Sequence, residues 1–188
     1  MKTKLLALIV ALQVAWALAT IVTQETALRS GTVVHLETQP VDPRDLLRGD
    51  YVILNYKIST LPGSIFPEDF QTNRFTAALN GRDVYVLLEK RGEFHEAVSA
   101  SLERASDDPQ RPQLRGTIRY SQWGGNRTND TMRVEYGLER YYVEEGTGNP
   151  RGKLTVDVSV PASGRGLIKQ VYVDGVPYAE AMKGERRR

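Results

Sequence analysis

Residues 5–22, LLALIVALQVAWALATIV, are the feature that most constrains this chain. Among these 18 residues only Gln13 and Thr20 are polar. As an α-helix the stretch would span about 27 Å at 1.5 Å per residue, close to the ~30 Å hydrocarbon core of a bilayer. A core helix of a soluble protein would keep a polar face, which is missing here. The sequence therefore predicts that this segment enters or crosses a membrane.

The flanking charges predict its orientation. Lys2 and Lys4 precede the apolar stretch, and Glu25 is the first charged residue after it. The positive-inside tendency then leaves the N-terminus in the cytoplasm and the rest of the chain on the other side. Two alternatives remain open. The apolar length favours a retained single-pass signal anchor, whereas cleavage after Ala19, at a small-x-small site, would release a secreted domain.

Composition excludes several kinds of site. The chain has no cysteine, so disulfides, thiolate metal sites and cysteine nucleophiles are absent. Its two histidines, His35 and His95, lie in strand-like stretches where ordinary core or surface positions are commoner. We predict no catalytic set, no metal site and no cofactor.

The charge balance argues against a nucleic-acid partner. Lys2, Lys4 and three terminal arginines account for the formal charge of +2. Between residues 23 and 183 there are 20 basic and 22 acidic residues, with the signs interspersed. Nucleic-acid binding needs a concentrated basic face, which such a pattern does not supply.

After residue 31 the hydrophobic pattern changes to a period of two, which is typical of strands. We expect an all-β domain over residues 31–183, an antiparallel sandwich or partly open barrel of about nine strands, preceded by the transmembrane helix and short stalk of residues 1–30 and followed by a basic tail, 184–188. The expected strands are 32–37, 50–58, 83–91, 93–102, 114–121, 131–137, 138–143, 153–160 and 166–174. Within 153–160, valines alternate with Thr155, Asp157 and Ser159, which predicts a sheet with one wet face.

A compact motif occupies residues 49–56, GDYVILNY, after the Pro-rich segment PVDPRDLLR. In the strand that follows, Leu54 and Tyr56 face one side, which we take as core, and Tyr51 faces the other. Gly49 suits the turn into the strand, and Asp50 can accept nearby backbone N–H groups. This motif, with residues 134–148 and 168–178, resembles the GDYXXLXY family.

The resemblance implies a bacterial membrane-anchored protein. With the charges that flank the apolar segment, it leads us to expect a single-pass inner-membrane protein whose C-terminal domain lies in the periplasm. It also implies a multi-pass membrane protein as partner, and it offers no catalytic residues to carry over. We therefore expect a binding or assembly module for a membrane protein or an envelope component, and not an enzyme.

Two charged, tyrosine-bearing stretches provide the candidate binding residues. These are Arg44, Arg48, Asp50, Tyr51, Glu139 and Tyr141. The alternative is a cell-envelope hydrolase that uses an Asp/Glu/Arg cluster near Asp50 and Glu139, which requires two carboxylates about 5–10 Å apart. Lys57 and Ser59 would share a strand face, as a Ser/Lys hydrolase needs, but no Ser-x-Met-x-Pro segment accompanies them.

Overall fold

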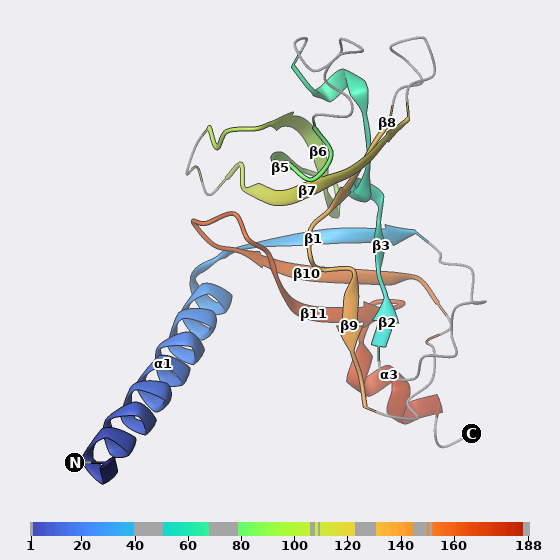
Figure 1. Ribbon diagram of the computed structural model, residues 1–188. Helices are drawn as coiled ribbons and strands as arrows, with labels where there is room; N and C mark the ends of the chain where they lie inside the picture. The colour runs from blue at the N-terminus through green and yellow to red at the C-terminus, as the bar shows by residue number, and fades with distance from the viewer. Residues whose placement is uncertain are drawn as a thin grey trace.

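The computed structural model describes residues 2–39, 51–67, 79–105, 108, 110–122, 131–144, 150 and 152–185. Its first element is helix α1 (Lys2–Ser30), which projects away from a β-rich head (Figure 1). Residues 3–30 are long and apolar enough to cross a membrane, and their most apolar window is 0% buried against the head. The helix continues through residues 23–30 and ends before Gly31.

The described part of the head contains twelve strands and a short closing helix. The strands are β1 (Thr32–Gln39), β2 (Tyr51–Ile53), β3 (Asn55–Tyr56), β4 (Thr60–Pro62), β5 (Asp83–Arg91), β6 (Phe94–Ser101), β7 (Gln113–Gln122), β8 (Thr131–Glu135), β9 (Arg140–Tyr142), β10 (Leu154–Val160), β11 (Leu167–Val173) and β12 (Val176–Pro177). Two 3-10 turns, η2 (Lys57–Ser59) and η3 (Gly63–Ile65), flank β4, and the helix is α3 (Tyr178–Glu185).

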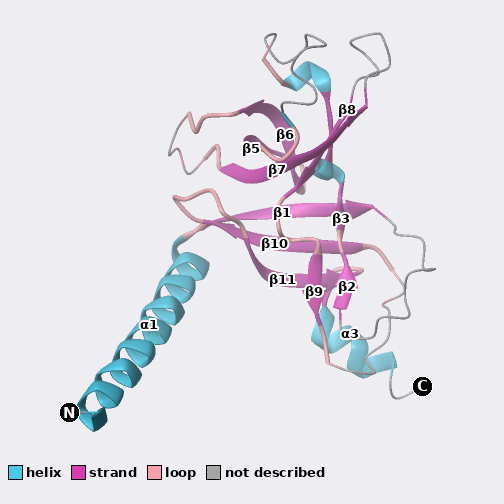
Figure 2. Cartoon of the chain, in the orientation of Figure 1, coloured by secondary structure: helices cyan, strands magenta, loops and turns pink. Residues whose placement is uncertain are grey.

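These strands form three antiparallel sheets (Figure 2). One five-stranded sheet has the order β12-β11-β10-β1-β3, and the other has the order β4-β8-β7-β5-β6. Strands β2 and β9 form a separate two-stranded ribbon. The expected all-β domain behind one apolar helix is confirmed, and the sheets do not close into a barrel.

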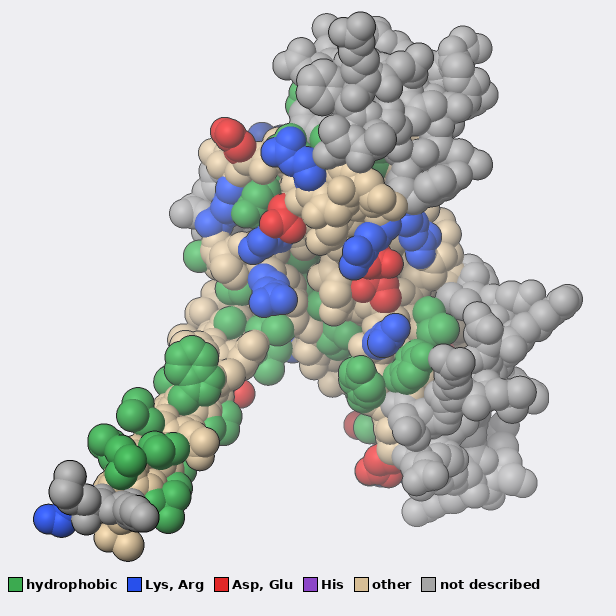
Figure 3. Space-filling model, viewed as in Figure 1, with side chains coloured by type: hydrophobic (Ala, Val, Ile, Leu, Met, Phe, Trp, Pro, Cys, Tyr) green, Lys and Arg blue, Asp and Glu red, His purple; other side chains and the backbone are tan. Residues whose placement is uncertain are grey.

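Alternating apolar residues of both large sheets build one core. Val34 and Leu36 of β1 and Val156 and Val158 of β10 are fully buried, and Val84, Val86 and Leu88 of β5 are buried against the same cluster. Figure 3 shows hydrophobic side chains along α1, whereas basic and acidic side chains are mixed over the visible face of the head. The exposed apolar surface of α1 is what a lipid-facing helix requires.

The structure differs from the expected strands in three places. The expected strand 50–58 divides at Leu54, whose N–H donates to the carbonyl of Glu139 at 2.8 Å. Strands β4 and β12 were not expected, because elements of two or three residues are too short to show a hydrophobic period. Helix α3 extends two residues into the expected tail. The outer face of β10 is less exposed to solvent than expected, because Thr155 and Ser159 are buried.

The junction between helix and head is tight. The Ser159 hydroxyl donates to the carbonyl of Ala27 at 3.0 Å, and the N–H of Gly31 donates to the same carbonyl at 3.2 Å. A Cβ at Gly31 would lie 2.9 Å from backbone atoms of Val160 and Pro161, so only glycine fits without a shift. The helix therefore enters β1 directly, without a flexible linker.

Candidate functional site

The signature residues that the structure describes lie mainly in the core. Arg44, Arg48, Gly49 and Asp50 lie outside the described residues. Leu54 and Tyr56 are each 1% exposed. The predicted inward face of this strand is confirmed.

Two buried tyrosines join the signature segment to the turn before β9. The Tyr56 hydroxyl donates to the carbonyl of Leu138 at 2.9 Å, and the Tyr136 hydroxyl donates to the carbonyl of Ile58 at 2.7 Å. Burial, and secondarily the charge of Glu139, raises the pKa of both phenols far above its usual value. Both side chains therefore stay neutral donors, and their role is structural.

Glu139 takes part in the same turn. One of its carboxylate oxygens accepts the N–H of Tyr136 at 2.6 Å. Tyr141, two residues on, packs edge-to-face against Tyr178 of α3 with ring centroids 5.4 Å apart.

Tyr51 belongs to an exposed surface that we name the tyrosine ribbon: Tyr51 and Ile53 of β2 with Arg140 and Tyr142 of β9. Tyr51 pairs with Tyr142 and Ile53 with Arg140, so all four side chains share one face. The two tyrosine rings lie 6.1 Å apart, and the Arg140 guanidinium lies 5.4 Å from the centre of the Tyr51 ring. Tyr142 is 71% exposed.

The Lys57 and Ser59 pair does not form a site. Both residues lie in the 3-10 turn η2, where positions two apart point in different directions. Ser59 is fully buried, whereas Lys57 is exposed and bonds to Glu37. The expectation that they share a strand face was wrong, because the strand ends at Tyr56.

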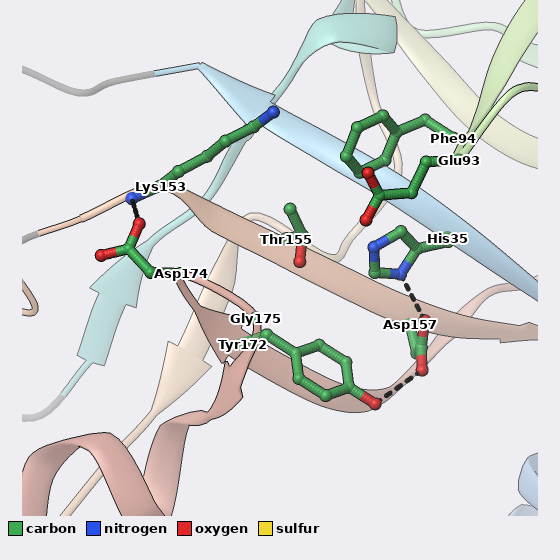
Figure 4. Close-up of a pocket in the computed structure, with 9 residues that line it drawn as sticks. All are labelled: His35, Glu93, Phe94, Lys153, Thr155, Asp157, Tyr172, Asp174 and Gly175. Carbon is green, nitrogen blue, oxygen red and sulfur yellow. Dashed lines mark hydrogen bonds and ion pairs between the residues drawn. The ribbon is translucent and has the colours of Figure 1, made fainter.

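A hollow of about 410 Å³ opens on the outer face of β1, β10 and β11 (Figure 4), and we name it the His35 pocket. Its size falls within the usual range for small-molecule sites. Strands β1, β10 and β11 supply His35, Thr155, Asp157 and Tyr172, and β6 supplies Phe94. The neighbouring turns supply Glu93, Lys153, Asp174 and Gly175.

Asp157 organises this pocket. One of its oxygens lies 2.6 Å from Nδ1 of His35, and the other accepts the Tyr172 hydroxyl at 2.9 Å. The hydrogen bond to Asp157 raises the pKa of Tyr172. With Nδ1–H donating to the carboxylate, Nε2 of His35 keeps a free lone pair directed away from Asp157. The Phe94 ring stacks on the imidazole at 5.1 Å and fixes its plane.

Sheet register explains how these residues meet. His35 of β1 lies directly opposite Asp157 of β10, and Thr155 pairs with Tyr172 of β11. His35 and Asp157 are 122 positions apart in the chain. The sequence did not identify this pocket, although the polar residues alternating along 153–160 were a signal that could have pointed to it.

A chain of ion pairs closes one side of the pocket. Glu37 binds Lys153 at 2.6 Å and also binds Lys57. Its hydrogen bonds to Lys153 and then to Lys57 lower the pKa of Glu37. The Lys153 ammonium also lies 4.7 Å from the centre of the Phe94 ring. This lysine is therefore already compensated within the head.

His95 supports the pocket from β6. Its Nδ1 accepts the backbone N–H of His35 at 3.0 Å, at an edge of β1 where β3 pairs only with Thr38 and Gln39. Burial lowers the pKa of His95. Neutral His95 thus serves as an acceptor that satisfies the strand edge.

No group of three or more metal-ligating side chains occurs in the part of the chain that the structure describes. The arrangement is instead a polar pocket rich in hydrogen-bond acceptors. It can bind and orient a group that donates hydrogen bonds.

Comparison with family models decides what kind of chain this is. A family model described as GDYXXLXY protein matches residues 13–171. The chain belongs to the GDYXXLXY family. No curated protein and no solved structure matches it. In this GDYXXLXY protein the described signature residues Leu54 and Tyr56 hold the β2–β3 segment in place, whereas Tyr51 faces outward.

Proposed function

We propose that this GDYXXLXY protein is a bacterial inner-membrane protein with one span, whose β head lies in the periplasm and binds a multi-pass membrane protein. Residues 5–22 would cross the bilayer as a retained anchor, with the N-terminus in the cytoplasm. The observation that carries the proposal is the junction at Gly31, where an unburied apolar helix enters the head without a linker.

The stalk sets the height of the head. Residues 23–30 rise about 12 Å as a helix, while the headgroup layer extends roughly 5–8 Å beyond the hydrocarbon. Arg29 and Glu25 pair at 2.6 Å and support the helical stalk in water. The head would therefore sit immediately above the headgroups, within reach of the short loops of a membrane protein.

The tyrosine ribbon is the surface that suits such a partner. Ribbon strands β2 and β9 lie on the same side of the head as α1, with the β4–β8 sheet on the opposite side (Figure 1). Exposed tyrosine and arginine side chains are enriched among residues that dominate binding energy at interfaces. Ile53 adds a partly exposed apolar contact beside them.

Site-specific photocrosslinking in native membranes tests the proposal. A photoreactive phenylalanine analogue replaces Tyr142 in the full chain, and a matched variant carries it at Arg82, which is exposed in the turn before β5. We expect one discrete adduct from position 142, identified by mass spectrometry as a multi-pass membrane protein, and none from position 82.

Two results would overturn this assignment. The same adducts from both positions, or none from either, would argue against a specific partner at the ribbon. An adduct to a glycan or other envelope component would replace the membrane protein as the partner class.

A further inference from the structure

The His35 pocket has a negative lining. Its walls contain the carboxylates of Glu93, Asp157 and Asp174 but one ammonium, that of Lys153. Because Lys153 already binds Glu37 at 2.6 Å and lies over the Phe94 ring, its charge is compensated. The negative charges of the lining would repel an anionic ligand, whereas they would attract a cation.

A threonine hydroxyl lies at the floor of this pocket. Thr155 is only 7% exposed, and its hydroxyl makes no hydrogen bond to any residue that the structure describes. Figure 4 shows this side chain rising from β10 into the space between Lys153 and His35. Because this hydroxyl borders the pocket, it can accept a hydrogen bond from a ligand bound there.

His35 adds a second directed acceptor. Asp157 holds Nδ1 at 2.6 Å, and the other ring nitrogen therefore faces away from this carboxylate. A ligand that complements these side chains would donate several hydrogen bonds and carry positive charge. A primary ammonium has three donors and no acceptor, which fits this set of side chains.

We propose that the His35 pocket binds a ligand through a protonated primary amine, held by the Thr155 hydroxyl, Nε2 of His35 and the carboxylates of Glu93 and Asp157. The inference rests on the proposed binding role, since it names the chemistry that the head recognises. It does not depend on the partner at the tyrosine ribbon or on the compartment.

The amine can come from a soluble molecule or from a phosphoethanolamine headgroup. Asp157 and Ser159 lie on the same outer face of β10, and the Ser159 hydroxyl donates to the carbonyl of Ala27 near the end of α1. Two residues of a strand span about 7 Å, so the pocket opens near the helix that enters the bilayer. Both sources present the same primary ammonium group, and the experiment distinguishes between the two sources.

Nuclear magnetic resonance of the full chain in an uncharged detergent provides the test. Ethanolamine is titrated against ethylene glycol, which has the same size but no ammonium. We expect saturable shifts of the Thr155 and His35 signals with ethanolamine alone. Glu93→Gln should weaken the apparent affinity about tenfold, because it removes the negative charge while keeping side-chain shape, and Thr155→Val should weaken it several-fold, because it removes the hydroxyl.

Glu180→Gln, at an exposed position on α3, is the matched control and should leave the titration unchanged. Nanodiscs of phosphatidylethanolamine or phosphatidylglycerol then identify the source. Ethanolamine-like shifts in the first lipid alone assign the headgroup, and their absence in both assigns a soluble amine.

The proposal fails if ethanolamine produces no saturable shift, if ethylene glycol reproduces it, or if Glu93→Gln binds as tightly as the native chain. The detergent-solubilised chain contains no membrane partner, so this failure would leave the crosslinking result untouched. Conversely, a missing adduct at Tyr142 would leave amine binding intact.

Discussion

Single residues of the signature stabilise the fold, and their contribution can be measured. Tyr56 and Tyr136 cross-link the signature segment to the β8–β9 turn through two buried hydroxyls. Each bond satisfies a carbonyl that has lost contact with water, so removing the donor exposes the full desolvation cost. This explains a tyrosine at position 56, where a phenylalanine would fill almost the same volume.

We expect Tyr56→Phe to lower the free energy of unfolding by about 1–3 kcal/mol, because it leaves the Leu138 carbonyl unsatisfied. Urea unfolding of the detergent-solubilised chain measures the change. Tyr142→Phe is the control, since that side chain is 71% exposed and such surface changes usually stay within about 0.5 kcal/mol. Equal losses in the two variants would contradict the structural role of Tyr56.

Glu37 gives a prediction about pH. Lys153 and Lys57 lower its pKa below the ordinary value of 4.5, so the folded state favours the ionised carboxylate. The resulting stability is present above pH 4.5 and is lost as the pH falls through the lowered pKa. The chain should therefore be more stable than its Glu37→Gln variant at pH 7, and the gap should close towards pH 3.

Thermal unfolding midpoints at several pH values between 7 and 3 check this. Glu135→Gln is the matched control, because Glu135 pairs with Arg119 at the surface, 45% exposed, where ion pairs contribute little. A stability gap that stays constant with pH would show that Glu37 acts through packing and not through its charge.

At the scale of elements, the junction at Gly31 is the most sensitive point. Gly31→Ala places a Cβ against the backbone of Val160 and Pro161, and such overpacking typically costs about 1–3 kcal/mol. We expect faster hydrogen exchange in the first residues of β1 and a lower unfolding midpoint. Ser30→Ala, one residue earlier and exposed, should change neither. Unchanged exchange in Gly31→Ala would mean that the junction is looser than the contacts imply.

The same scale shows which elements a sequence can reveal. Strand β5 coincides with the predicted range 83–91, because Val84, Val86 and Leu88 alternate over nine residues. The sequence predicts β2 and β3 as one strand, because their division depends on a hydrogen bond from the Leu54 N–H to the Glu139 carbonyl, which only the folded chain makes. Short elements such as β12 are stabilised by neighbouring strands and leave no periodic pattern.

The candidate site was harder to predict for a related reason. Tyr51 could be placed on an outward face from strand alternation alone. His35 and Asp157 could not be paired, because their contact depends on β1 lying beside β10 in the sheet. A single polar residue on a strand is uninformative until its cross-strand neighbour is known.

At the scale of the whole molecule, α1 and the head form one connected body. The apolar helix is unburied, and hydrogen bonds from Ser159 and Gly31 fix its end to the sheet. In the arrangement that we propose, this connection would set which face of the head approaches the bilayer, and with it the position of the tyrosine ribbon and the His35 pocket.

Labelling of single cysteines in intact bacterial cells tests this arrangement most directly, because the chain has no native cysteine. Thr3→Cys reports on the start of α1, and Ala162→Cys reports on an exposed turn of the head. With a maleimide that passes the outer membrane but not the inner one, we predict labelling at position 162 in intact cells and at position 3 only after the inner membrane is broken. Labelling of both positions in intact cells, or loss of residue 3 from the mature chain, would contradict a retained anchor with its head outside.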